Sequence, residues 1–192
     1  MKHFLSYVDE SIKANWNSPA LSNYGANTFT YGEVAAEIER MHLLFEQCGI
    51  KKGDKIALCS RNSAEWGIAY FAVVSYDAVC VPLLADFLPQ NIADLTRLSD
   101  SRLLMVDDSI FGGLKRDDIL PQFEGFADFC GLVNLVGLKV LVDCNDKLKD
   151  INEKVDAAFA ERFPKGVTPK YINYKKTDLD ALAVISYTSG TT

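Results

Sequence analysis

The sequence predicts an α/β fold with a largely parallel sheet flanked by helices. Short uncharged runs such as "AVCVPLL" have the continuous hydrophobicity of strands that are buried on both faces of a parallel sheet. Longer stretches with apolar residues three and four positions apart follow them, as expected of crossover helices. From Gly53 onward the two kinds of segment alternate, which indicates a right-handed βαβαβ unit.

Composition limits the classes of function. The chain has 192 residues, 48% of them hydrophobic and 24% charged, which suits one large domain or part of a bigger one. Its formal net charge of -6 argues against a nucleic-acid-binding protein, which needs a basic face. A nucleotide ligand stays possible, because backbone N–H groups can hold phosphates without net positive charge.

Cysteine usage and the absence of targeting signals predict a cytoplasmic location. The five cysteines are widely spaced and form no CxxC pair, so we expect buried free thiols rather than disulfides or metal ligands (Cys48, Cys59, Cys80, Cys130 and Cys144). The first residues lack the apolar core of a signal peptide. No run of about 18 apolar residues predicts a transmembrane segment, and peripheral membrane contact stays open.

The N-terminal third contains two predicted helices and a hairpin. Apolar residues at helical spacing predict a helix over residues 4–16, and a turn at 23–26 predicts a hairpin. A second apolar stripe predicts a helix that starts after Thr30 and ends at Gly49. Thr30 and Glu33 have the spacing of a capping box, and Asn62 to Glu65 repeat that pattern more weakly.

The rest of the chain is read as alternating strands and helices. Strands are predicted over 55–60, 78–84, 102–106, 138–143 and 182–186, and helices over 62–77, 88–101 and 148–164. Glycines, acidic residues and scattered aromatics over 107–134 suggest short helices and loops. Residues 164–180 form a polar connection. No interdomain linker or internal repeat is visible.

Several residues that could carry chemistry are better explained structurally. His3 and His42 have no nearby cysteine or second histidine, so no metal site or nucleophile is predicted. Trp66 and Tyr70, one helical turn apart, are interpreted as core residues. The acidic pairs are interpreted as solvated loops (Asp107 with Asp108, Asp117 with Asp118, and Asp178 with Asp180). Neither GxSxG nor GxGxxG occurs.

The stretch "YTSGTT" at 187–192 is the strongest candidate site. It follows an apolar run, and loops that leave the carboxyl ends of buried strands are where open α/β sheets bind ligands. Gly190 can take a positive φ, so consecutive N–H groups can form an anion-binding nest. The four hydroxyls can donate to phosphate or bind a phosphate-bound Mg²⁺ (Thr188, Ser189, Thr191 and Thr192). A Walker A loop is excluded, because no GxxxxGK[ST] string is present.

Three stretches in order, "FTYGEV", "VSYDAVCVPL" and "LAVISYTSGTT", resemble the first three core motifs of the adenylate-forming superfamily. That group contains acyl-CoA synthetases, peptide-synthetase adenylation domains and luciferases. The resemblance covers residues 28–106 and 179–192 and is weak between them. One departure is Asp77, where the second motif usually has glycine, so the turn there is expected to differ locally.

The resemblance implies an AMP-forming acyl-CoA synthetase, with a long-chain fatty acid as substrate. A carboxylate would attack the α-phosphate of ATP to give acyl-AMP and pyrophosphate, and coenzyme A would then take the acyl group. Residues Thr188 to Thr192 would hold the β- and γ-phosphates, with Thr188 on Mg²⁺. The family's catalytic residues lie outside this stretch, so no residue of this chain is assigned as catalytic.

The chain resembles the first part, residues 1–192, of the large N-terminal AMP-binding domain and ends inside the third motif. We therefore expect the remainder of that domain and a C-terminal lid domain in the parent, and neither adenylation activity nor tight ATP binding in these residues alone. Two alternatives remain: another carboxylate-adenylating ligase, and a non-catalytic binding or scaffolding module. Chain length of the acid and oligomeric state are left open.

Overall fold

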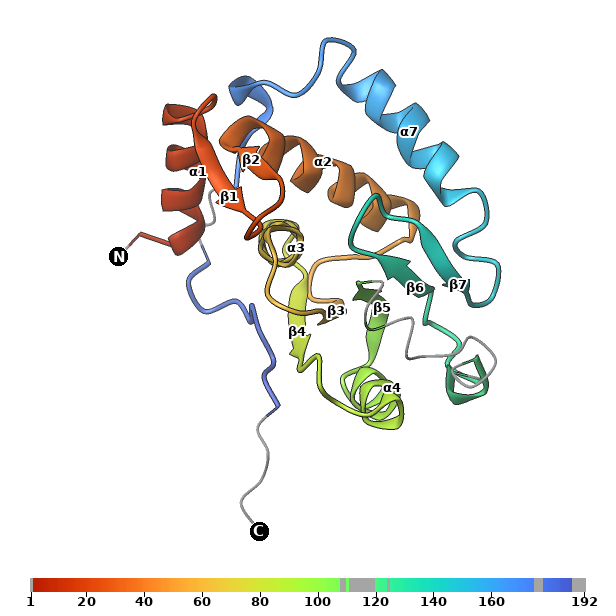
Figure 1. Ribbon diagram of the computed structural model, residues 1–192. Helices are drawn as coiled ribbons and strands as arrows, with labels where there is room; N and C mark the ends of the chain where they lie inside the picture. The colour runs from red at the N-terminus through yellow and green to blue at the C-terminus, as the bar shows by residue number, and fades with distance from the viewer. Residues whose placement is uncertain (1, 108–109, 111–119, 124, 175–177, 188–192) are drawn as a thin grey trace.

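The computed structural model describes residues 2–107, 110, 120–123, 125–174 and 178–187. A five-stranded sheet has the order β4-β3-β5-β6-β7, with helices on both sides (Figure 1). Its strands are β3 (Lys55–Cys59), β4 (Val79–Leu83), β5 (Ser101–Val106), β6 (Gly131–Asn134) and β7 (Val140–Asp143). The helices are α1 (Phe4–Ala14), α2 (Tyr31–Gln47), α3 (Ala64–Ser75), α4 (Pro89–Leu98), α7 (Ile151–Arg162) and the short 3₁₀ turns η1 (Leu120–Phe123) and η2 (Pro169–Tyr171).

The sheet is mostly parallel, as the sequence predicts. Strands β4, β3, β5 and β6 run parallel, and β7 pairs antiparallel with β6 at the edge. Strand β6 was missed, because a four-residue strand among turn residues gives little pattern. Its first residue shows why a glycine is there: at Gly131 φ is 144°, and a Cβ would lie 2.1 Å from the Val142 carbonyl oxygen of β7.

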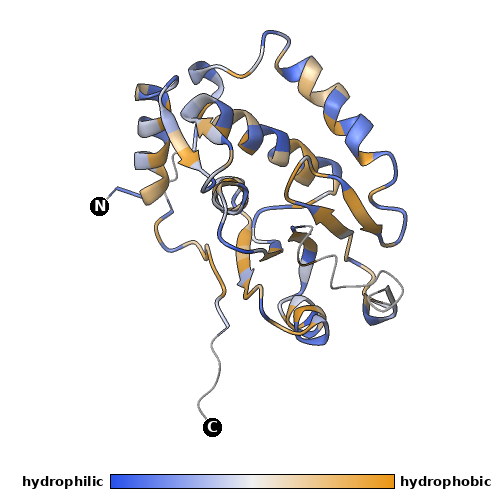
Figure 2. Ribbon diagram, viewed as in Figure 1, coloured by the Kyte–Doolittle hydropathy of each residue, from blue (hydrophilic) through white to orange (hydrophobic). Residues whose placement is uncertain are grey.

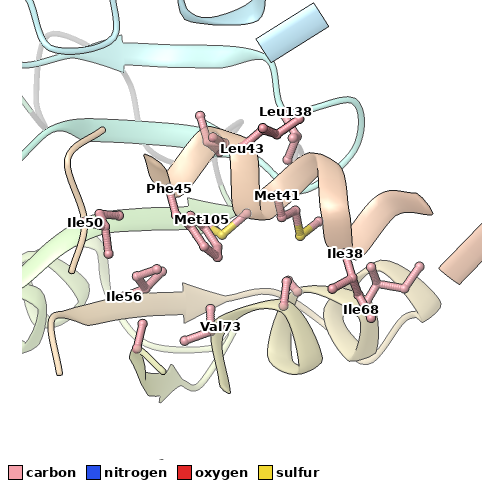
Figure 3. Packing of buried hydrophobic residues seen from close by; sticks show 14 of the residues in the cluster. Ile38, Met41, Leu43, Phe45, Ile50, Ile56, Ile68, Val73, Met105 and Leu138 are labelled. Carbon is pink, nitrogen blue, oxygen red and sulfur yellow. The ribbon is translucent and has the colours of Figure 1, made fainter. Parts of the chain in front are cut away.

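The two faces of the sheet carry separate hydrophobic clusters, since alternate residues of each strand point to opposite sides. The α2 face, as we call the first, is covered by α1, α2, α3 and α7. The second, the α4 face, is covered by α4 and by the segment of η1 and the loop after it. Figure 2 shows apolar residues along the strands between these layers. In Figure 3, Phe45 of α2 lies against Met105 of β5, with Ile56 of β3 below them.

Local signals set the helix ends. At α2 the Thr30 hydroxyl accepts from the Glu33 N–H at 3.2 Å, and the Glu33 carboxylate accepts from the Thr30 N–H at 2.7 Å, which confirms the capping box. Gly49 follows the last turn with φ 66°, as predicted. At α3 the cap is Ser63 rather than Asn62, and its hydroxyl accepts from the Trp66 N–H at 3.1 Å.

The hairpin precedes α2 and packs on it. Strands β1 (Pro19–Ser22) and β2 (Thr28–Thr30) pair antiparallel around the predicted turn. The helix before them, α1, ends at Ala14, two residues short of the predicted end. Trp16 turns back instead, and its indole packs so closely on Gly32 that a Cβ there would lie 2.7 Å from the ring.

The cysteines match the prediction of free thiols. All five are reduced, four are buried, and Cys144 is partly exposed. None of the helices in the described ranges is long and apolar enough to cross a membrane.

The turn before β4 keeps the conformation that glycine would favour. Asp77 has φ 66°, in the left-handed region, and its carbonyl accepts from the Gly53 N–H at 2.8 Å. The expectation that this turn differs from that of the family stays a prediction. Aspartate is among the non-glycine residues that tolerate this region best, because its short polar side chain can bond locally.

Candidate functional site at the carboxyl edge of the sheet

The carboxyl ends of β3, β4 and β5 meet at one edge of the sheet. The connection from β3 to β4 runs through α3 on the α2 face, and the connection from β4 to β5 runs through α4 on the other face. The connections that follow the neighbouring strands β3 and β4 therefore leave the sheet on opposite faces. Open α/β sheets bind their ligands at such a switch point.

Asp107 organises this switch point from the end of β5. Its carboxylate accepts from the Ser60 hydroxyl at 2.7 Å and from the Arg61 N–H at 3.1 Å, both just after β3. It also accepts from the Ile110 N–H at 2.9 Å. The interpretation of Asp107 as a solvated loop residue is wrong, because the strand order brings it beside a segment more than forty residues earlier in the chain.

Of the other acidic residues that we interpreted as solvated, only Asp178 and Asp180 lie in the part of the chain that the structure describes. Asp178 accepts from the Asp180 N–H at 3.1 Å, and both residues are exposed, so the loop interpretation holds for them. Asp108, Asp117 and Asp118 lie outside the described residues.

A cavity of about 420 Å³ lies at this edge, and we call it the carboxyl-edge cavity. Arg61 supplies a positive charge at its rim, where the guanidinium lies 3.5 Å from the Asp86 carboxylate and both side chains are exposed. The lining combines polar groups after β3 with apolar groups after β4 (Ser60, Arg61, Asn62, Trp66, Pro82, Leu83, Leu84, Ala85, Asp86, Ser186 and Tyr187). Such a mixture fits a ligand that is polar at one end.

Trp66 lies between this cavity and the core, and Tyr70 packs beside it. Their rings stack with centroids 5.7 Å apart, and both pack against the hydrophobic cluster of the α2 face. Both side chains are half-buried at the margin of that cluster, so the prediction that they are core residues is confirmed in part. Trp66 also lines the cavity, which the sequence did not indicate.

Cys59, the last residue of β3 and the neighbour of Ser60 in the cavity lining, has a thiol that is protonated at neutral pH. Burial, together with the negative charge of Asp107, raises the pKa of Cys59 to about 12. Its sulfur lies 3.7 Å from the Leu84 carbonyl oxygen. Cys59 is therefore a packing residue and not a nucleophile.

The histidines have structural partners. His3 caps α1, where its Nδ1 accepts from the Leu5 N–H at 3.2 Å. The Nε2 of His42 lies 3.0 Å from both the Ala72 carbonyl oxygen and the Ser75 hydroxyl. Among the described residues no group of three or more His, Cys, Asp or Glu side chains could hold a metal ion.

The third motif enters the site beside the second. Cys80 of β4 donates its N–H to the Ala183 carbonyl and accepts from the Ile185 N–H, both at 2.9 Å, in a parallel bridge to Val184. The prediction of a strand over 182–186 is wrong, because pairing is confined to this one bridge. Its direction is nevertheless that of the parallel strands, so the described chain runs toward the carboxyl edge.

Tyr187 lies in the lining of the cavity, as the last described residue of the third motif. The five residues proposed to hold phosphate follow it immediately and lie outside the described residues (Thr188, Ser189, Gly190, Thr191 and Thr192). The first motif does not reach the cavity lining, and its Thr30 and Glu33 cap α2.

Comparison with known proteins identifies the family. The family model described as AMP-binding enzyme matches residues 8–192. The chain belongs to the AMP-binding enzyme family. The resemblance to adenylate-forming enzymes is thereby confirmed.

The relatives include ligases and a peptide synthetase. A crotonobetaine/carnitine–CoA ligase from Escherichia fergusonii is 34% identical over 164 residues, 78% of this chain and 32% of the relative. Surfactin synthase subunit 2 of Bacillus subtilis is 28% identical over 102 residues, 53% of this chain and 3% of the relative. The chain thus spans a third or less of the length of these relatives.

Solved structures confirm the fold. The anthranilate CoA ligase AuaEII, in complex with anthranoyl-AMP, superposes with a TM-score of 0.72 at 17% identity, covering 98% of this chain and 32% of that one. The N-terminal domain of FACL13 from Mycobacterium tuberculosis gives 0.67 at 19% identity, covering 98% of this chain and 42% of that one. At such identities the likeness concerns the fold alone.

Proposed function

We propose that residues 1–192 are the first part of the AMP-binding domain of an acid–CoA ligase. The enzyme would join a carboxylic acid to AMP at the expense of ATP and then transfer the acyl group to coenzyme A. One observation carries the proposal beyond family membership: residues 183–187 run parallel to β4 and end in the lining of the carboxyl-edge cavity. The hydroxyl-rich stretch 188–192 follows directly in the sequence.

Residues Thr188 to Thr192 hold the β- and γ-phosphates of ATP in this proposal. Their N–H groups and hydroxyls would donate to oxygens on which negative charge builds up as the acid attacks the α-phosphorus and pyrophosphate leaves. Donors that are fixed beforehand stabilise that charge without reorganisation. None of these side chains acts as base or nucleophile.

The described residues fit an anionic ligand in part. Arg61 brings positive charge, which the Asp86 carboxylate of the same lining offsets, and Ser186 brings a hydroxyl, whereas the Ser60 hydroxyl already donates to Asp107. Both oxygens of the nearby Asp107 already accept hydrogen bonds within the protein, so they do not form a ready metal site. We therefore assign the Mg²⁺ contact to the Thr188 hydroxyl, and Mg²⁺ would screen the phosphate charge when bound.

The acid is proposed to be a fatty acid, as the resemblance of the motifs implies. The identity to a crotonobetaine/carnitine–CoA ligase supports a second candidate, a small polar acid of that type. Both share the adenylation step, so one assay can separate them. A parent without that step would be a binding or scaffolding module.

The test is acid-dependent exchange of labelled pyrophosphate into ATP by the full-length parent, across fatty acids of different length, crotonobetaine and carnitine. We expect exchange with one of these classes and only background exchange with residues 1–192 alone. Thr191→Ala should lower exchange on the order of 10²-fold, because it removes a phosphate donor. Thr168→Ala, the same change before η2, is the control and should leave the rate unchanged.

The exchange assay distinguishes a ligase that uses residues 188–192 from a ligase that does not, and both from a non-catalytic module. Exchange by the parent with the rate intact in Thr191→Ala and Thr188→Ala would contradict the role of the loop. Absence of exchange with every acid, in a folded parent, would favour the non-catalytic module.

A further inference from the structure

Two cysteines far apart in the sequence lie against each other on the α2 face. Cys48 is the residue that caps the C-terminus of α2, and Cys130 immediately precedes β6. The Cys130 thiol donates to the Cys48 carbonyl oxygen across 3.6 Å, which brings the Cys130 sulfur beside Cys48, and both side chains belong to the hydrophobic cluster of the α2 face. We propose that Cys48 and Cys130 form a redox-sensitive pair that a peroxide oxidises to an intramolecular disulfide.

The packing excludes the other thiols as partners of Cys130. Cys144 pairs with Cys130 only through the backbone, by an N–H···O bond of 2.9 Å, and its side chain packs on the opposite α4 face. Cys59 also lies on the α4 face. Cys80 lies on the correct face, but in β4, three strand spacings or roughly 14 Å from β6.

The surroundings of Cys130 favour its thiolate. Interaction with the Cys48 side chain and the positive charges of Arg102 and Lys147 together lower the pKa of Cys130 to about 7, against the opposing effect of burial. The same contact and burial raise the pKa of Cys48. One thiol of the pair is thus the nucleophile, and the other stays protonated until it resolves the intermediate.

Oxidation proceeds in two balanced steps. The Cys130 thiolate attacks one oxygen of hydrogen peroxide and breaks the O–O bond, which leaves a sulfenic acid and a hydroxide that takes a proton to become water. The Cys48 sulfur then loses its proton and attacks the Cys130 sulfur. The S–S bond forms, the S–O bond breaks, and a second water leaves. Two electrons pass from the thiols to the peroxide.

Access limits the rate of this reaction. Cys130 is fully buried and Cys48 is 6% exposed. Cys48 lies where Gly49 ends α2, and helix ends open locally at lower free-energy cost than the core of a sheet. We therefore expect slow oxidation that follows local opening.

The sequence allows a direct assay, because each cysteine falls in a different tryptic peptide: 41–51 (Cys48), 56–61 (Cys59), 62–97 (Cys80), 117–139 (Cys130) and 140–147 (Cys144). The purified chain is treated with hydrogen peroxide, blocked with iodoacetamide without reduction, digested and analysed by mass spectrometry. We expect peptide 41–51 linked to 117–139, reversed by dithiothreitol. The oxidised chain should also unfold at higher urea concentration, since a long loop is closed.

Matched variants decide the assignment. Cys48→Ser and Cys48→Ala should abolish the link and leave Cys130 as sulfenic acid that dimedone traps, whereas Cys144→Ser should leave the link intact. Circular dichroism checks that each variant is folded, and mapping of the unmodified chain decides the question if the variants unfold. A link from Cys130 to any other cysteine, or free thiols at both positions under peroxide that oxidises glutathione, would overturn the proposal.

Discussion

The two faces of the sheet are built from the same strands but differ in what covers them. The α2 face is closed by four helices and contains most of the largest fully buried side chains, such as Phe45 and Ile38. Among the described residues, the α4 face is covered by α4, Ile110, the η1 turn and the loop after it. Exposed leucines lie in α4 and in the segment before it, with Leu84, Leu88 and Leu98 all more than 60% accessible.

The difference in covering gives the two faces different roles: the α2 face contributes mainly to stability, and the α4 face with the carboxyl edge leaves groups accessible to a ligand. Packing density decides how much a buried side chain contributes, and a surface enclosed by rigid helices cannot relax when an atom is removed. We infer that the α2 face supplies most of the free energy of unfolding. The α4 face and the carboxyl edge beside it leave groups such as Arg61 accessible to a ligand.

The comparison is tested most strongly by truncating one phenylalanine on each face. Phe45→Ala should cost about 3–5 kcal/mol, and Phe123→Ala about 1–2 kcal/mol less, because the turn and loop around Phe123 can collapse into the space. Both side chains are buried, and Phe123 stacks on Phe129 with ring centroids 4.5 Å apart. Urea unfolding followed by circular dichroism measures both. Equal losses would mean that the faces contribute alike.

The second test concerns a buried carboxylate that ties the C-terminal segment to the α2 face. Asp9 is fully buried, and it accepts from the Lys13 ammonium at 2.8 Å and from the Tyr174 N–H at 2.9 Å. Asp9→Ala should cost about 2 kcal/mol, since it leaves the Tyr174 N–H without an acceptor. Asp9→Asn keeps an acceptor oxygen and should lose less than half as much. A loss that is the same for both variants would show that the Lys13 pair dominates.

The sequence predicted the α2 face well because its signals are local. The stripe that includes Val34, Ile38 and Phe45, the capping box at Thr30 and the glycine after the helix all lie within one helix length. Continuous apolar runs predicted β3, β4 and β5, which are buried on both sides. Hydrophobic periodicity and helix-capping residues can be recognised without knowing how the rest of the chain folds.

The site was less predictable because it depends on strand order. Nothing near Asp107 in the sequence indicates that it accepts from Ser60 and Arg61, since the contact exists only when β5 lies beside β3. The run at 182–186 has the composition of a strand, yet forms one bridge to Cys80. Whether a short apolar run pairs fully depends on its neighbours rather than on its own residues.

A smaller effect is expected at the helix starts. Thr30→Ala removes the α2 cap and should cost about 1 kcal/mol, because the Glu33 N–H loses its acceptor and Glu33 loses part of its reciprocal bond. Ser63→Ala at α3 is the matched change, with a single cap bond, and should cost about half as much. Thermal unfolding of the two variants compares them. A larger loss at Ser63 would show that reciprocity adds nothing at Thr30.

The smallest effect is a gain at two of the left-handed aspartates, one after a helix on each face. Asp77 follows α3 with φ 66°, and Asp100 follows α4 with φ 54°. Glycine reaches this region without Cβ strain, so Asp77→Gly should stabilise the chain by about 0.5 kcal/mol, and Asp100→Gly by a similar amount. High-precision urea midpoints are needed for differences of this size. A loss at Asp77 with a gain at Asp100 would mean that the Asp77 side chain makes a contact worth more than the strain, and that the departure from the usual glycine is compensated on the α2 face.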